Sequence, residues 1–108
     1  MPETTEIRFI EVATEDEIPI NERIFLEIDD YPIVVINLAG KLFAVGDVCT
    51  HDNGPVGDGE LDGYEIICPR HGARFDIRSG KATRAPAFTD IPSYTVKVED
   101  GKVFIGIK

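Results

Sequence analysis

Residues 49–72 have the sequence CTHDNGPVGDGELDGYEIICPRHG. This stretch begins with the motif Cys49-Thr50-His51 and, after a gap of sixteen residues, continues with Cys68-Pro69-Arg70-His71. The two motifs contain both cysteines and both histidines of the chain. Thiolates and imidazoles are ligands that bind transition metals. The pattern therefore predicts a metal centre held by Cys49, His51, Cys68 and His71.

The residues around the motifs indicate two tight turns. Four ligands must converge on the centre from two directions, and two neighbouring loops that each present one Cys and one His would achieve this. The first motif runs into Asn53-Gly54-Pro55, while the second contains Pro69 and is followed by Gly72. These are turn-forming residues. Turns of this kind also direct backbone N–H groups toward a bound negative charge.

The two motifs and their spacing resemble the Rieske iron–sulfur family, in which Cys-x-His precedes Cys-x-x-His. The resemblance continues through Gly72-Ala73-Arg74-Phe75-Asp76 and Ser79-Gly80-Lys81 to Ala85-Pro86-Ala87, which takes the place of the family's cluster-covering loop. It implies one [2Fe-2S] cluster per chain. It also implies that Cys49 and Cys68 hold the buried iron, while His51 and His71 hold the outer iron.

Mixed ligation favours one-electron chemistry. Two ferric ions, two sulfides and two thiolates sum to zero charge, because neutral imidazoles add none. An electron is added more easily to such a neutral centre than to one with four thiolates, so histidine ligation raises the reduction potential. A structural zinc site and a metal-free relative are the alternatives. Zinc modules usually place like ligands together, whereas each motif here mixes cysteine and histidine.

The chain departs from the high-potential members of the family at informative positions. Those proteins carry an extra cysteine in each cluster loop, where this chain has Gly54 or a neighbour and Arg70. They also place hydroxyl groups where this chain has Ala73 and Phe75, and neither residue can donate a hydrogen bond to the cluster sulfurs. We therefore expect a low potential, near the bottom of the range of about −150 to +300 mV for such centres.

The length and charge restrict the class of protein. A chain of 108 residues indicates a single domain over 1–108, with a cluster-binding subdomain over about 45–77. The beginning of the sequence lacks the pattern of a secretory signal, and no apolar run is long enough to span a membrane, so a cytoplasmic location is expected. The net charge of −9 disfavours nucleic acid as a partner. It is compatible with steering toward basic faces of redox partners as well as with simple solubility.

The fold class expected is all-β. The family resemblance implies a small antiparallel β-sandwich or barrel, into which the cluster-binding subdomain is inserted as two β-loops. Ile33-Val34-Val35-Ile36 is apolar without alternation, which indicates a strand covered on both sides. A capping-box pattern at Thr14-Glu15-Asp16-Glu17 predicts one short helical turn. Apolar patterns and turn signals predict strands over 7–12, 23–28, 33–38, 42–45, 64–67, 94–98 and 103–107.

The favoured function is that of a soluble ferredoxin, an electron carrier and not an enzyme. No histidine follows His71, so the chain cannot build the mononuclear iron site of an oxygenase catalytic subunit. The resemblance implies transient docking to a flavin-dependent ferredoxin reductase and a terminal oxygenase, and a monomer is expected. The alternatives are a small non-catalytic subunit of a larger reductase such as assimilatory nitrite reductase, a ferredoxin of iron–sulfur assembly, and a zinc-stabilised interaction module. Docking roles for Arg70 and Arg74 stay open.

Overall fold

The computed structural model describes residues 7–50, 54–70, 72–85 and 89–107. Within these ranges the chain is almost entirely β-structure. The strands are β1 (Arg8–Thr14), β2 (Arg23–Ile28), β3 (Tyr31–Leu38), β4 (Lys41–Gly46), β5 (Leu61–Asp62), β6 (Glu65–Ile67), β7 (Arg74–Asp76), β8 (Ala82–Arg84), β9 (Ser93–Tyr94), β10 (Val96–Glu99) and β11 (Lys102–Ile107). No helix in this part of the chain is long and apolar enough to cross a membrane.

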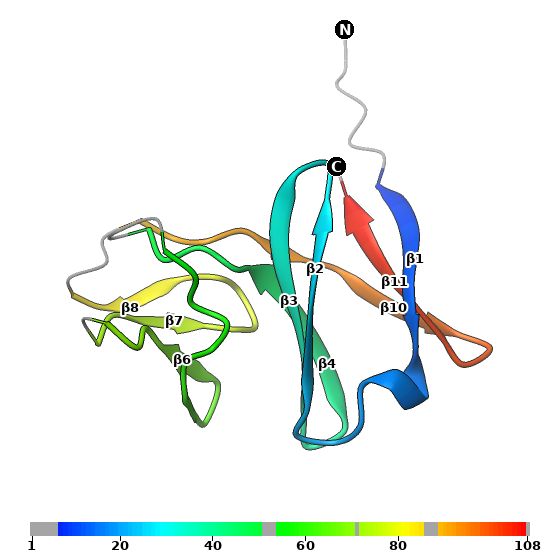
Figure 1. The fold of residues 1–108 in the computed structure, drawn as a ribbon, viewed down its shortest axis with the longest axis horizontal. Coiled ribbons are helices and arrows are strands. Elements are labelled where there is room, and N and C mark those ends of the chain that lie inside the picture. Colours follow the sequence, from blue (N-terminus) through cyan, green and yellow to red (C-terminus); the bar gives the residue numbers. More distant parts are fainter. Residues whose placement is uncertain (1–6, 51–53, 71, 86–88, 108) are drawn as a thin grey trace, which may run out of the picture.

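The strands form three antiparallel sheets, as Figure 1 shows. The first has the order β1-β11-β10, the second β2-β3-β4-β9, and the third β5-β6-β7-β8. The second sheet lies in the middle, and the third sheet lies at one end of the molecule. The all-β antiparallel class is thus confirmed. Of the two architectures expected, the described strands form layered sheets and do not close into a barrel.

Strand β3 is covered on both faces, as its apolar run predicted. Ile33 and Val35 belong to an apolar cluster shared with the first sheet. Val34 and Ile36, which alternate with them, belong to a second cluster shared with the third sheet. Since neighbouring side chains of a strand point to opposite faces, this single strand packs against both other sheets. The central sheet therefore holds the third sheet in place.

Three two-residue hairpins connect the longer strands. Asp29-Asp30, Ala39-Gly40 and Asp100-Gly101 all have positive φ at both central positions. That conformation matches the twist of antiparallel strands. The predicted helical turn is a 3-10 turn, η1 (Glu15–Glu17), in which the Glu17 carboxylate accepts a 2.8 Å hydrogen bond from the Thr14 N–H.

The strand predicted over 94–98 is wrong as a single element. Tyr94 pairs with Ala44 in the central sheet, whereas Val96 pairs with Ile105 in the first sheet. The chain changes sheets at Thr95, whose carbonyl accepts a 2.8 Å bond from the Gly106 N–H. Periodicity could not detect this change, because the alternation of side chains continues through it. Short strands β7 and β8 were also absent from the expectation.

Candidate metal centre

Two loops of matching construction lie at the end of the third sheet. The Cys49 N–H donates to the Gly54 carbonyl at 2.7 Å, and the Cys68 N–H donates to the Ala73 carbonyl, also at 2.7 Å. Each bond joins a cysteine to the residue five positions later. Each predicted Cys/His motif therefore lies on a loop that a backbone hydrogen bond closes at its cysteine.

The second loop is the connection between β6 and β7. Cys68 directly follows β6, and Ala73 directly precedes β7. A further bond runs from the Gly72 N–H to the Cys68 carbonyl at 3.0 Å. Gly72 has φ +76°, a conformation that favours glycine over residues with a Cβ atom. The predicted turn after Pro69 is thus present, with glycine at the position that needs it.

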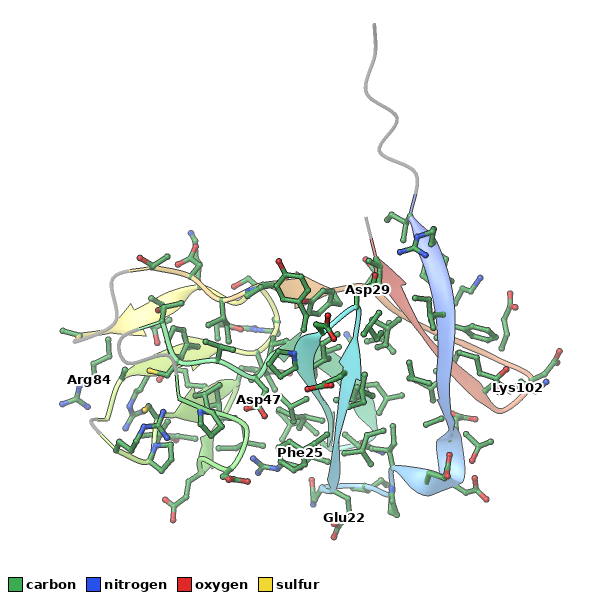
Figure 2. The ribbon with its side chains drawn as sticks, turned by 45° about the horizontal axis from the view of Figure 1, so that its top comes forward. Glu22, Phe25, Asp29, Asp47, Arg84 and Lys102 are labelled. Atoms are coloured by element: carbon green, nitrogen blue, oxygen red, sulfur yellow. The ribbon has the colours of Figure 1, made fainter. Side chains whose placement is uncertain are left out.

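The first loop is anchored from outside by residues that sequence reasoning missed. Asp47 Oδ1 accepts the Val56 N–H at 3.0 Å and the Gly57 N–H at 2.5 Å. The same segment is also held by Arg23 of β2, whose Nη1 donates to the Gly57 and Gly59 carbonyls at 2.5 and 2.8 Å. Figure 2 shows Asp47 where the end of the central sheet meets the third sheet. No sequence signal marks these contacts, which join residues up to 36 positions apart.

The two cysteines are brought together in one buried environment. Cys49 is 0% exposed and Cys68 is 1% exposed. Both belong to the apolar cluster that includes Ala73 and Phe75, which are each 0% exposed. Two thiols from matching loops therefore share a buried, apolar surrounding. This fits a pair of thiolates that hold one buried iron.

His51 and His71 lie outside the described residues, as do Pro86 and Ala87 of the expected covering loop. Of the four predicted ligands, the structure thus describes the two sulfur donors. Within the ranges that it describes, no group of three or more His, Cys, Asp and Glu side chains is arranged to bind a metal ion. The donor set of two buried thiols and two imidazoles in matching loop motifs fits a Rieske cluster in kind.

The two loops also contact each other directly. A Cβ atom placed on Gly54 would lie 2.8 Å from Cζ of Arg70, so the guanidinium of the second loop packs against the backbone of the first. Gly54 or a neighbour, and Arg70, are the positions at which the high-potential members of the family are expected to carry extra cysteines. Here the Arg70 side chain contacts the backbone of Gly54 and joins the two loops at this place.

The segment before β9 is fastened to both the first loop and β8. Thr50 Oγ1 donates to the Thr89 carbonyl at 2.5 Å. Asp90 Oδ1 accepts the Ala82 N–H at 2.9 Å. Residues 89 and 90 are therefore held beside the loop that carries Cys49.

Charged residues of the third sheet form two compact groups. Arg74 Nη1 contacts Asp62 Oδ2 at 2.8 Å and Glu65 Oε1 at 3.1 Å, and these hydrogen bonds raise the pKa of Arg74. Arg78 pairs with Asp76 at 2.8 Å, and its hydrogen bond lowers the pKa of the Asp76 carboxyl. Arg74 is thus occupied inside the sheet and is poorly placed for docking.

Comparison with known proteins identifies the family. Residues 8–95 match the model of the Rieske [2Fe-2S] domain. The chain belongs to the Rieske [2Fe-2S] domain family.

The similarity extends over nearly the whole chain. A ferredoxin component of naphthalene 1,2-dioxygenase/salicylate 5-hydroxylase systems from Ralstonia sp is 35% identical over 97 residues, which are 90% of this chain and 93% of the relative. Among solved structures, Sphingomonas yanoikuyae B1 ferredoxin has a TM-score of 0.83 and 31% identity over 94% of this chain and all of that chain (100%). A chain in a complex of reduced oxygenase and oxidized ferredoxin of carbazole 1,9a-dioxygenase shares the fold, with a TM-score of 0.81, 24% identity and coverage of 90% and 91%.

Proposed function

We propose that this protein is a Rieske-type ferredoxin that carries single electrons from a flavin-dependent reductase to a terminal oxygenase. The observation that carries the proposal is the burial of Cys49 and Cys68, each the first residue of a matching loop, in one apolar cluster. Relatives that span 90% or more of the chain are named as ferredoxin components of dioxygenase systems, which supports the same function. They favour it over a nitrite reductase subunit or an assembly ferredoxin.

The proposed ligands are Cys49 and Cys68 for the buried iron, and His51 and His71 for the outer iron. The burial of both sulfur donors supports the first part of this assignment. When bound, the [2Fe-2S] cluster supplies one-electron chemistry. The chain itself contributes two loops that backbone hydrogen bonds close, a buried apolar surrounding for the two cysteines, and anchors at Asp47 and Arg23 that hold the first loop.

The proposed organisation is one domain over 1–108, with the cluster-binding subdomain inserted at about 45–77. The β5–β8 sheet, which reaches Arg84, supports an insertion that extends somewhat further. The protein would act as an electron carrier without catalysis of its own. We also propose that the protein is a monomer and that it is cytoplasmic. The cytoplasmic location is supported by the assignment of both cysteines to the cluster, which leaves none for a disulfide.

The cofactor is tested by purification under anaerobic conditions, with quantitation of iron, zinc and acid-labile sulfide and EPR of the reduced protein. Two irons and two sulfides per chain and a reducible cluster are expected for a Rieske centre. Stoichiometric zinc without sulfide would contradict the proposal.

The ligand set is tested by single substitutions. Cys49→Ser, Cys68→Ser, His51→Ala and His71→Ala should each abolish or strongly deplete the cluster, since each removes one of four ligands. Thr50→Ala is the matched control within the first motif, because it removes only the bond to the Thr89 carbonyl. Full cluster content in any of the four ligand variants would exclude that residue from the set.

A further inference from the structure

Arg84 lies at the same end of the third sheet as the loop of Cys68. Within this sheet Arg84 pairs with Arg74, and Arg74 pairs with Ile67, the residue directly before Cys68. Adjacent strands are about 4.8 Å apart. The backbone of Arg84 is therefore about 10 Å from the start of the second loop, measured across two strand spacings.

A register shift places Arg84 at this position. Arg74 pairs with Arg84 but Phe75 pairs with Ala82, so β8 contains one extra residue, Thr83. Such bulges occur on edge strands and beside functional sites, where they redirect a side chain. Strand β8 is an edge strand of its sheet, and Arg84 is exposed. Figure 2 shows Arg84 at the end of the molecule opposite to Lys102.

No interaction within the third sheet explains the presence of a charged side chain at Arg84. Like charges that stand directly opposite each other in a ladder are destabilising. Arg74 is compensated by Asp62 and Glu65. Arg84 has no carboxylate within ion-pair distance in the described part of the chain. Its positive charge is thus available to a group outside the protein.

The charge around the loops differs from that of the remaining protein. Described residues between 45 and 85 include six acidic and five basic side chains, whereas the other described residues include eleven acidic and five basic ones. The acidic surplus therefore lies mainly away from the loops. An exposed, uncompensated cation near them would form a local positive point in an acidic protein.

We propose that Arg84 is an anion-binding docking point beside the loop of Cys68 and that it binds a carboxylate on an acidic surface patch of a redox partner. This inference rests on the proposed ferredoxin function. A charge-assisted contact of this kind fixes the orientation of a transient complex and accelerates its formation. Arg84 would thus help to turn the cluster end of the ferredoxin toward the partner.

The test measures electron transfer from the reduced, cluster-loaded protein to two small oxidants by stopped flow. Ferricyanide is the anionic probe and hexaamminecobalt(III) is the cationic probe. Arg84→Gln should lower the ferricyanide rate constant about three- to fivefold at low salt, because a trivalent anion loses an attraction over about 10 Å. It should raise the hexaamminecobalt(III) rate, and both effects should shrink as salt is added.

Lys102→Gln is the matched control, since it removes the same charge at the opposite end of the molecule. This control should change either rate constant by less than about 1.5-fold, because a charge this far from the loops is strongly screened. Arg84→Lys should restore the ferricyanide rate. Equal effects of Arg84→Gln and Lys102→Gln would overturn the docking proposal and leave the ferredoxin function intact. A wild-type protein that transfers no electron to either oxidant would instead contradict the function itself.

Discussion

At the scale of single residues, Ala73 and Phe75 set the polarity around the cysteines. Both are completely buried and share the apolar cluster of Cys49 and Cys68. Neither carries a group that can donate a hydrogen bond to sulfur. The two positions at which this chain lacks the hydroxyl groups of high-potential members of the family therefore lie in the same buried cluster as the proposed cysteine ligands.

We predict that Ala73→Ser and Phe75→Tyr each raise the reduction potential. A hydrogen bond to a charged group contributes about 1.5–3 kcal/mol. If all of this favoured the reduced state, each added hydroxyl would raise the midpoint by about 60–130 mV. Protein-film voltammetry provides the measurement. Ala13→Ser is the control, because Ala13 is buried in the other apolar cluster and its substitution should leave the midpoint unchanged.

A second residue-scale prediction concerns the pH dependence of stability. The Arg78 side chain holds the pKa of Asp76 below its ordinary value of 3.8. A carboxyl whose pKa is lower in the folded state stabilises the fold above its unfolded pKa, and this contribution is lost as the pH falls through the folded value. The stability difference between wild type and Arg78→Gln should therefore be constant above about pH 5. This difference in stability should become smaller below pH 3.8.

Thermal unfolding from pH 7 to pH 3 measures this difference. A part of it should persist in acid, because the Arg78 guanidinium also lies 4.0 Å from the ring centre of Tyr64 and this contact does not depend on Asp76 ionisation. Lys81→Gln is the control for loss of a nearby positive charge. A difference that is independent of pH would contradict the assigned ion pair.

At the scale of elements, the first loop depends on the end of β4 for its position. Asp47 follows Gly46, the last residue of β4, and its carboxylate takes the N–H groups of Val56 and Gly57. Gly57 has little space for a side chain, since an added Cβ would lie 2.6 Å from the ring of Phe25 and 2.8 Å from Asp47 Oδ1. The tight packing at Gly57 and the two hydrogen bonds to the Asp47 carboxylate thus fix the chain where it leaves the first loop.

Asp47→Ala should lower the free energy of unfolding by about 1.5–3 kcal/mol, because it removes a charged acceptor from two backbone donors. It should also accelerate loss of the cluster. Asp47→Asn should have a smaller effect, since its amide oxygen can still accept. Urea unfolding and the decay of cluster absorbance provide the measurements. Asp58→Asn, at an exposed position, is the control, and an equal loss in that variant would show that general charge is responsible.

At the scale of the whole molecule, the distribution of charge matters more than its total. The longest extent is 42 Å, several times the screening length of about 10 Å at 0.1 M salt. The hairpin of Glu99 and Asp100 lies far from the third sheet in Figure 1. Asp58 and Glu60 instead line an open hollow that also includes Cys68 and Pro69. Carboxylates near the loops should therefore control encounter with a redox partner.

We predict that Asp58→Asn with Glu60→Gln raises the rate of electron transfer to ferricyanide at 0.1 M salt. Glu99→Gln with Asp100→Asn, which removes the same total charge, should leave it nearly unchanged because its charges are screened over the intervening distance. Stopped-flow mixing at several salt concentrations provides the measurement. Equal rates in the two double variants would mean that net charge alone governs the encounter.

The sequence determined the chemistry of the site and much of the local structure. Soft ligands in two spaced motifs indicated the family because a metal centre restricts both residue type and spacing. The apolar run of β3 predicted a strand covered on both sides, and the capping-box pattern predicted the helical turn at Glu15–Glu17. Such features depend on neighbouring residues, which a sequence displays directly.

Only the tertiary structure decided how distant segments meet. The contacts of Arg23 with Gly57 and Gly59, the packing of Arg70 against Gly54, and the change of sheet at Thr95 all join parts of the chain that no local pattern connects. The same holds for Arg84, whose place depends on a one-residue shift in an edge strand. Side-chain periodicity gives the buried face of a strand, but strand pairing and long-range hydrogen bonds decide which strand it faces.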